Sequence, residues 1–300
     1  MNQLYDGDKL DLLRRHIDDA QTQRTQVMSR ERAKRCIFCG QQNPSSNEDA
    51  LPLWIQRTAL ERDPTAEMFC EWDGARRWQV RITDKKSNAF RVNRVCRSCN
   101  NGWMSALEEQ VRPSIEPAIF GAGAVTWTRT QQRIVATWIA KTVVVFEHAS
   151  FNMKGRSEAF TSPFFDADDR RHIYDAKLPP TNTLIWVAAY IPEDDLFFRH
   201  GADIDFTLAP APPTFGAGEA YCSTMLIGHF AFQLVSFWRK RLDDKRGSTG
   251  IELNIGRGWL DKTILIWPPD IATASARWPP SCALDKQWFD ALARRIDNVS

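Results

Sequence analysis

The sequences CIFC at residues 36–39 and CRSC at residues 96–99 decide how the first part of this chain folds. In each C-x-x-C knuckle, the two intervening residues allow both thiolates to face one metal ion. Two knuckles together supply the four ligands of a closed tetrahedral site, which structural zinc prefers. We therefore predict one zinc site shared by both knuckles, with two disulfides or free thiols as the alternative. Its ligands are Cys36, Cys39, Cys96 and Cys99.

The bulk composition narrows the class of protein. The 300 residues are 43% hydrophobic and include twelve tryptophans, which favours folded domains over disorder. No apolar run approaches the roughly 20 residues needed to span a bilayer, and the N-terminus lacks the apolar stretch of a secretory signal. We expect a cytoplasmic protein without membrane attachment, in which thiols stay reduced and bind metal. The remaining cysteines are predicted to be buried packing residues: Cys70, Cys222 and Cys282.

Basic residues are concentrated immediately before the second knuckle. The net charge is only +2, but residues 76–97 contain six arginines and two lysines against a single acid, Asp84. A local positive field of this kind suits a phosphate backbone, although an ordinary solvated hairpin face would have the same composition. The predicted nucleic-acid contacts are Arg76, Arg77, Arg81, Arg91, Arg94 and Arg97.

The pattern of apolar residues predicts an α+β chain in three parts. Residues 1–34 form a polar helical arm, a candidate for homo-oligomer contacts or for packing on the core. Residues 35–120 form a zinc-binding domain, and Gly121 and Gly123 mark a boundary before a second α+β domain at 124–300. The expected elements of the zinc domain are a helix at 50–60, a hairpin at 67–73 and 76–83, a strand at 89–95 and a helix at 101–112.

The second domain is expected to contain a mainly antiparallel sheet. A broad apolar face predicts a buried helix at 130–149, in which Lys141 and Glu147 are either a buried functional pair or a helix end that reaches solvent. Strands are expected at 181–191, 202–210, 223–238 and 262–269, with a closing helix at 283–296.

Two further segments adjoin the knuckles: SSNEDALPLW at 45–54 and CNNGWMSALEE at 99–109. Together with the knuckles they resemble the zinc-stabilised HNH-type nucleases, over roughly residues 35–117. The resemblance implies a ββα metal fold that holds one divalent cation against the scissile phosphate of DNA. It also implies a histidine that takes the proton from the attacking water, oriented by an asparagine. Glu48 matches the acidic position, Asn100 matches the asparagine, and Asp49 stands where the histidine is expected.

An aspartate at the histidine position changes the expected chemistry. Its reference pKa of about 3.9 makes it a much weaker base than histidine, at about 6.5. Asp49 is more natural as an oxygen ligand, so the expected catalytic cluster of Glu48, Asp49 and Asn100 would join Glu108 around Mg²⁺ or Mn²⁺. The alternative is that Glu48 and Asp49 cap a helix starting near Ala50, and that Asn100 caps the helix carrying Trp103.

Three functions remain open from the sequence. The first is an HNH-like metal-dependent endonuclease, or a relative of one, acting on DNA. The second is a catalytically inactive, zinc-stabilised module that binds nucleic acid. The third is a structural zinc module attached to a C-terminal domain that binds a small molecule or a protein.

Overall fold

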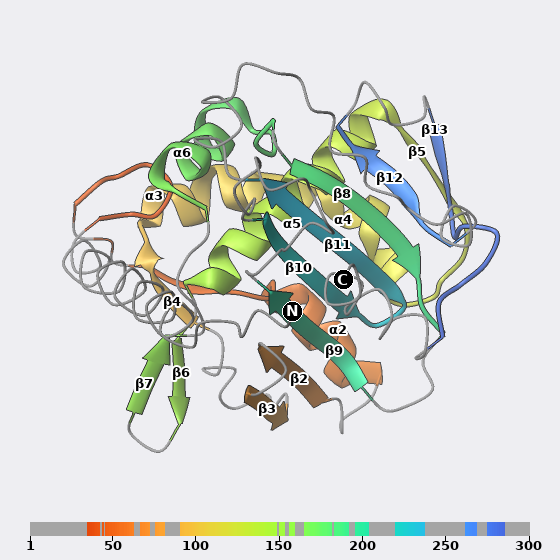
Figure 1. Cartoon of the computed structure of the whole chain (residues 1–300), viewed down its shortest axis with the longest axis horizontal. Helices are drawn as coiled ribbons and strands as arrows, with labels where there is room; N and C mark the ends of the chain where they lie inside the picture. Colours follow the sequence, from red (N-terminus) through yellow and green to blue (C-terminus); the bar gives the residue numbers. More distant parts are fainter. Residues whose placement is uncertain are drawn as a thin grey trace, which may run out of the picture.

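The elements of the fold are those of a computed structural model, shown in Figure 1. They confirm an α+β chain with mainly antiparallel sheets. None of the helices described is long and apolar enough to cross a membrane. The structure describes residues 35–42, 44, 46–62, 67–72, 76–81, 91–148, 150–153, 156–159, 165–181, 183–191, 196–203, 220–237, 262–268 and 275–285.

A seven-stranded sheet is the centre of the molecule (Figure 1). All of its neighbouring strands run antiparallel except β2 and β9, which are parallel. The hairpin of β2 and β3, which belongs to the first half of the chain, thus extends a sheet built from the second half. In spatial order the strands are β12 (Ile264–Trp267), β8 (Thr183–Ala189), β11 (Phe230–Phe237), β10 (Ala220–Ile227), β9 (Leu196–Asp203), β2 (Glu67–Trp72) and β3 (Arg76–Arg81).

Alternating side chains give this sheet two apolar faces. On β8, Ile185 and Val187 belong to the main core, whereas the intervening Ala188 and the following Tyr190 belong to a smaller cluster with Leu284. This alternation follows from the two-residue period of a strand. Both faces are therefore covered, and the larger cluster lies on the side of the helices.

Two helices, α4 (Ser105–Ile119) and α5 (Arg129–Glu147), pack against each other and against the sheet. The capping box that opens α5 is made by Thr128 and Gln131, which satisfy each other's free N–H groups. From Val135 to Glu147 every residue of α5 is buried, as its apolar sequence predicts. The helix therefore runs through the interior, and any charged side chain on it must find a partner there.

Five elements adjoin the knuckles in the chain. The strands β1 (Ser46–Asp49) and β4 (Arg91–Val95) form an antiparallel pair, and α2 (Leu53–Arg62) follows β1. After β4 come the short helix α3 (Arg97–Cys99) and the π-helical turn η2 (Asn100–Met104), which lead into α4. The predicted hairpin of β2 and β3 is confirmed, but the predicted third strand pairs with β1 rather than with that hairpin.

The remaining described elements lie around the sheet. Strand β5 (Val125–Thr128) pairs with β13 (Ser275–Trp278), and β6 (Ser150–Met153) pairs with β7 (Arg156–Ala159). Helix α6 (Ala167–Ala176) begins at the N-cap Asp166.

One predicted strand is wrong, and other predicted segments lie outside the described residues. The strand expected at 223–238 is two strands, because the two-residue turn at Gly228 and His229 joins β10 to β11, with Gly228 at φ +58°. The arm at 1–34, with its homo-oligomer role, and most of the closing helix lie outside the described residues. The division at about 120–124 stays a prediction.

Candidate metal centre and the adjoining acidic pocket

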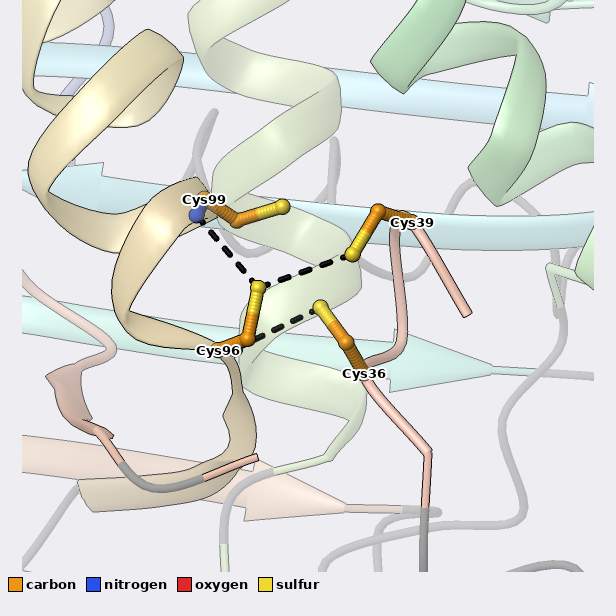
Figure 2. A group of neighbouring side chains, drawn as sticks. All are labelled: Cys36, Cys39, Cys96 and Cys99. Atoms are coloured by element: carbon orange, nitrogen blue, oxygen red, sulfur yellow. Dashed lines mark hydrogen bonds between the residues drawn. The ribbon is translucent and has the colours of Figure 1, made fainter. Parts of the chain in front are cut away.

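The sulfur atoms of Cys36, Cys39, Cys96 and Cys99 gather at one point (Figure 2). All four Sγ atoms lie within 4.8 Å of one another, and Cys39 and Cys96 are 3.5 Å apart. A zinc ion with ~2.3 Å bonds to sulfur needs tetrahedral edges of about 3.8 Å. No disulfide joins these four residues, which are free thiols in this structure. The group can therefore bind a structural metal such as zinc.

Local backbone geometry brings each knuckle to this point. The first knuckle closes as a tight turn, in which the Cys36 N–H donates to the carbonyl of Gln41 and Gly40 adopts φ +74°. In the second knuckle Cys96 is the N-cap of α3, and its sulfur accepts the N–H of Cys99 at 3.4 Å. The Cys96 N–H in turn donates to Cys36 Sγ at 3.4 Å, so the two knuckles are already joined by the protein.

Residues from α6 hold the first knuckle against the rest of the chain. Arg170 donates to the carbonyl of Ile37 at 3.0 Å, and Arg171 donates to the carbonyl of Cys39 at 2.9 Å. On the other side, Trp103 packs edge-on against Phe38 with ring centroids 5.1 Å apart. The cysteine cluster is therefore connected to the second half of the chain as well as to its own loops.

The thiols already influence one another's protonation. A hydrogen bond from Cys99 lowers the pKa of Cys36 to about 4, the ordinary value being 9.0. The same hydrogen bond, together with burial, raises the pKa of Cys99, and burial raises the pKa of Cys39. Thiolate is the form that binds metal, and the cluster favours it at Cys36.

The three cysteines outside the cluster were predicted to be buried packing residues. This prediction is wrong for Cys282, which is exposed. The side chains of Cys70 and Cys222 lie outside the described residues.

An acidic pocket adjoins this centre at Asn100, which follows Cys99 directly in the chain and lines the cavity. Its cavity measures about 170 Å³. All four residues predicted for the catalytic cation contribute to its wall, although they come from β1, η2 and α4. The lining residues are Glu48, Asp49, Pro52, Leu53, Asn100, Asn101, Ser105 and Glu108.

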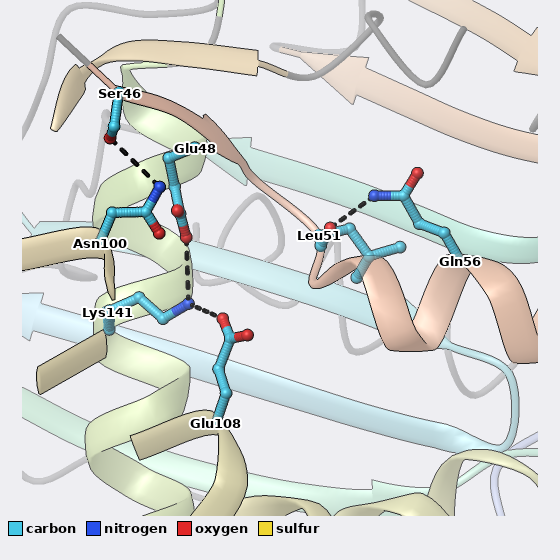
Figure 3. Close-up of polar contacts among 7 residues, drawn as sticks. All are labelled: Ser46, Glu48, Leu51, Gln56, Asn100, Glu108 and Lys141. Carbon is cyan, nitrogen blue, oxygen red and sulfur yellow. Dashed lines mark hydrogen bonds and ion pairs between the residues drawn. The ribbon is translucent and has the colours of Figure 1, made fainter. Parts of the chain in front are cut away.

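A buried lysine neutralises part of this pocket. The Nζ atom of Lys141, on α5, lies 2.7 Å from Oε1 of Glu108 and 3.9 Å from Oε1 of Glu48 (Figure 3). Lys141 thus pairs with these two carboxylates and not with Glu147, which accepts the Phe165 N–H at 3.4 Å. Burial raises the pKa of Glu48 to about 7, with Glu108 and Asp49 adding to the rise and Lys141 opposing it.

Asn100 connects the two sites. Its backbone N–H donates to the carbonyl of Cys96 at 3.0 Å, and its side-chain amide donates to Ser46 Oγ at 3.2 Å (Figure 3). Ser46 Oγ donates onward to the carbonyl of Val95 at 2.9 Å, which ties the amide to the paired strands β1 and β4. The π-helical turn that begins at Asn100 places both Asn100 and Asn101 in the pocket wall.

The alternative of helix capping is wrong for this group. Glu48 and Asp49 lie on β1, and α2 begins only at Leu53, so neither side chain is at its N-cap. Trp103 lies in η2, whose N-cap is Cys99, and Asn100 is instead the C-cap of α3. No histidine among the described residues lines the pocket.

The basic segment is divided between two sheets. Arg76, Arg77 and Arg81 lie on β3, the edge strand of the seven-stranded sheet, whereas Arg91 and Arg94 lie on β4. The side chains on β3 and that of Arg91 are outside the described residues. Arg94 is half-buried, and Arg97 on α3 is exposed. Their role in binding nucleic acid stays a prediction.

Comparison of the chain with protein-family models, with curated proteins and with solved structures found no match.

Sequence reasoning missed Asn101 and Ser105 in the wall of the pocket, and it did not find the partners of Lys141. Asn101 and Ser105 carry no signal beyond their closeness to Cys99, whereas Lys141 has a clear one. It is a lone cation within the apolar helical sequence WIAKTVVVF at 138–146. A charge in that position must be paired inside the protein, but its partners are 33 and 93 residues away along the chain.

Proposed function

We propose that this protein is an HNH-like, metal-dependent endonuclease, or a relative of one, that acts on the phosphodiester bonds of DNA. The proposal is supported by two paired strands and a helix next to the four cysteines. Strands β1 and β4 pair with each other, and α4 follows the second knuckle in the chain. The cysteines before and after these strands converge at one point. A pair of strands followed by a helix supports the ββα unit that we expect from the resemblance of residues 35–117.

The observation that carries the proposal is the convergence of Glu48, Asp49, Asn100 and Glu108 on one cavity. These residues offer carboxylate and amide oxygens, the ligands that Mg²⁺ and Mn²⁺ prefer. A cavity of about 170 Å³ has room for a cation with several of its waters. Asp49 and Glu108 would hold the cation, which when bound would polarise a phosphate oxygen and activate water.

Exposed arginines around the pocket suit a DNA backbone. Arg57 follows the lining residue Leu53 by one turn of α2. Arg112 follows Glu108 by one turn of α4, and Arg97 precedes Asn101 by four residues. Residues so spaced share a helix face, and all three arginines are exposed. These arginines would bind the flanking phosphates of the DNA backbone, and the acidic pocket would face the scissile phosphate.

The test is nicking of supercoiled plasmid DNA by the zinc-loaded full chain in the presence of Mg²⁺ or Mn²⁺. We expect Asp49→Ala and Glu108→Gln to reduce nicking by about 100-fold or more, because each removes an oxygen ligand. Glu109→Gln is the matched control, since Glu109 is the exposed neighbour of Glu108 on α4 and does not line the cavity. Equal nicking by the Asp49→Ala variant and the wild-type protein would refute the proposal.

A nucleic-acid-binding module without catalysis is the second candidate. Two observations favour it: an aspartate occupies the position of the expected histidine, and Lys141 already pairs with Glu48 and Glu108. This candidate predicts DNA binding without nicking, unchanged by Asp49→Ala. Cleavage that appears only in Asp49→His would identify the chain as a nuclease relative that has lost its base.

A further inference from the structure

Lys141, which follows the predicted domain boundary at 120–124, reaches two carboxylates of the pocket, those of Glu48 and Glu108. It lies in the middle of α5 and is fully buried, with 0% of its side chain exposed. Its two partners come from β1 and from α4 (Figure 3). Three elements that are separate in the sequence therefore meet at one ammonium group.

The burial of Lys141 has a cost that, among the described residues, these two carboxylates offset. Moving an ammonium ion out of water is unfavourable by several kcal/mol unless it is paired and hydrogen-bonded. The 2.7 Å contact with Glu108 Oε1 is a short, charge-assisted hydrogen bond, which restricts the orientation of that carboxylate. The contact with Glu48 at 3.9 Å is looser and attracts without fixing a hydrogen bond.

Glu48 has acceptor capacity that the described residues do not use. Its side chain is only 7% exposed and lines the cavity. Among the described residues no hydrogen bond to its carboxylate is found, and its ion pair with Lys141 is at the outer limit of such contacts. A nearly buried carboxylate in this condition has oxygen atoms available to a ligand in the cavity.

The ammonium group does not neutralise its two partners. Glu48 and Glu108 carry two negative charges when ionised, and Lys141 supplies one positive charge, so these three side chains together remain negative. Lys141 is not among the residues that line the cavity. An ion in the cavity and the ammonium group can therefore bind different oxygens of the same carboxylates.

We propose that Lys141 is the positioning residue of a divalent-cation site in this pocket. It binds Oε1 of Glu108, attracts Oε1 of Glu48, and so holds both carboxylates where a cation in the cavity can reach them. The inference rests on the proposed function in that the pocket is taken to be a cation site. Partners behind metal ligands commonly change metal affinity by 10- to 100-fold when they are removed.

The experiment is a titration of the zinc-loaded full chain with Mn²⁺, followed by electron paramagnetic resonance of free Mn²⁺. We expect Lys141→Met to weaken binding by about 10- to 100-fold. Lys141→Arg, which keeps the charge, should recover part of the affinity. Thr142→Val is the matched control, because Thr142 is the adjacent buried residue on α5 and does not line the cavity.

A second measurement covers the case in which Lys141→Met does not fold. In the wild-type chain, substoichiometric Mn²⁺ should broaden the backbone amide signals of Glu48, Glu108 and Lys141 before those of distant residues. Broadening elsewhere, with these three signals unchanged, would overturn the proposal. So would Mn²⁺ affinity in Lys141→Met that equals or exceeds that of the wild type.

The outcomes separate this inference from the proposed function. Lys141-dependent Mn²⁺ binding without plasmid nicking supports the positioning role and contradicts the nuclease. Nicking and Mn²⁺ affinity that are both unaffected by Lys141→Met support the nuclease and contradict the positioning role.

Discussion

Glu48→Gln should change how the stability of this protein depends on pH. The side chain of Glu48 is nearly buried beside Lys141. This burial raises the pKa of its carboxyl group to about 7 from an ordinary 4.5. A raised pKa means that the folded chain holds this proton more tightly than the unfolded chain does. Ionisation of Glu48 is therefore unfavourable to folding when the pocket contains no divalent cation.

The sign and size follow from proton linkage. Below about pH 4.5 the carboxyl group is protonated in both states and has no effect. As the pH rises from 4.5 to about 7, the unfolded state loses this proton first, so the contribution of Glu48 to stability falls. A difference of about 2.5 pH units corresponds to about 3 kcal/mol at 1.36 kcal/mol per unit. Glutamine cannot ionise, so Glu48→Gln should lack this fall.

The assay is urea unfolding of the zinc-loaded wild-type and Glu48→Gln chains at pH 5 and pH 8, without Mg²⁺ or Mn²⁺. We expect Glu48→Gln to gain stability relative to wild type on going from pH 5 to pH 8, by up to about 3 kcal/mol. Glu109→Gln, at the exposed neighbour of Glu108, should show no such gain. An identical change for wild type and Glu48→Gln between the two pH values would refute the reasoning.

Two further predictions concern the cysteine centre and the arginines. Cys99→Ser should abolish stoichiometric zinc binding and lower the thermal midpoint, because structural zinc contributes directly to folding. Cys282→Ser, at an exposed thiol outside the cluster, should change neither property in metal analysis and calorimetry. Arg57→Ala and Arg97→Ala should each weaken DNA binding for all sequences and lower the salt slope by about 0.9. Arg277→Ala, at an exposed arginine on β13, should leave the salt slope unchanged. Equal salt slopes in all three variants and the wild type would exclude phosphate contacts by Arg57 and Arg97.

The parts of the fold that sequence could predict are those specified by neighbouring residues. The C-x-x-C spacing indicates a shared site because ligand geometry is local to each knuckle. The hairpin of β2 and β3 was likewise predictable from two β-rich segments around a short turn. The buried helix α5 was predictable from its continuous apolar face.

The parts that sequence could not predict depend on distant partners. Strand β1 has the polar sequence SNED, which has low strand propensity, and it forms because β4 supplies its hydrogen bonds. Four of the eight residues around the pocket were identified in advance, since they flank the knuckles. Lys141 was visible as an anomaly, but its ion pairs exist only after α5 packs against α4.

The parallel pairing of β2 with β9 affects the order in which the chain can fold during its synthesis. Residues 67–72 must wait for residues 196–203 before that edge of the sheet can close. Leu196 comes 124 positions after Trp72, which at a translation rate of about 5–20 residues per second is a delay of roughly 6–25 s. Cys99 emerges from the ribosome only 27 residues after Trp72. The knuckles can therefore bind metal before β9, the neighbouring strand of the hairpin, has been synthesised.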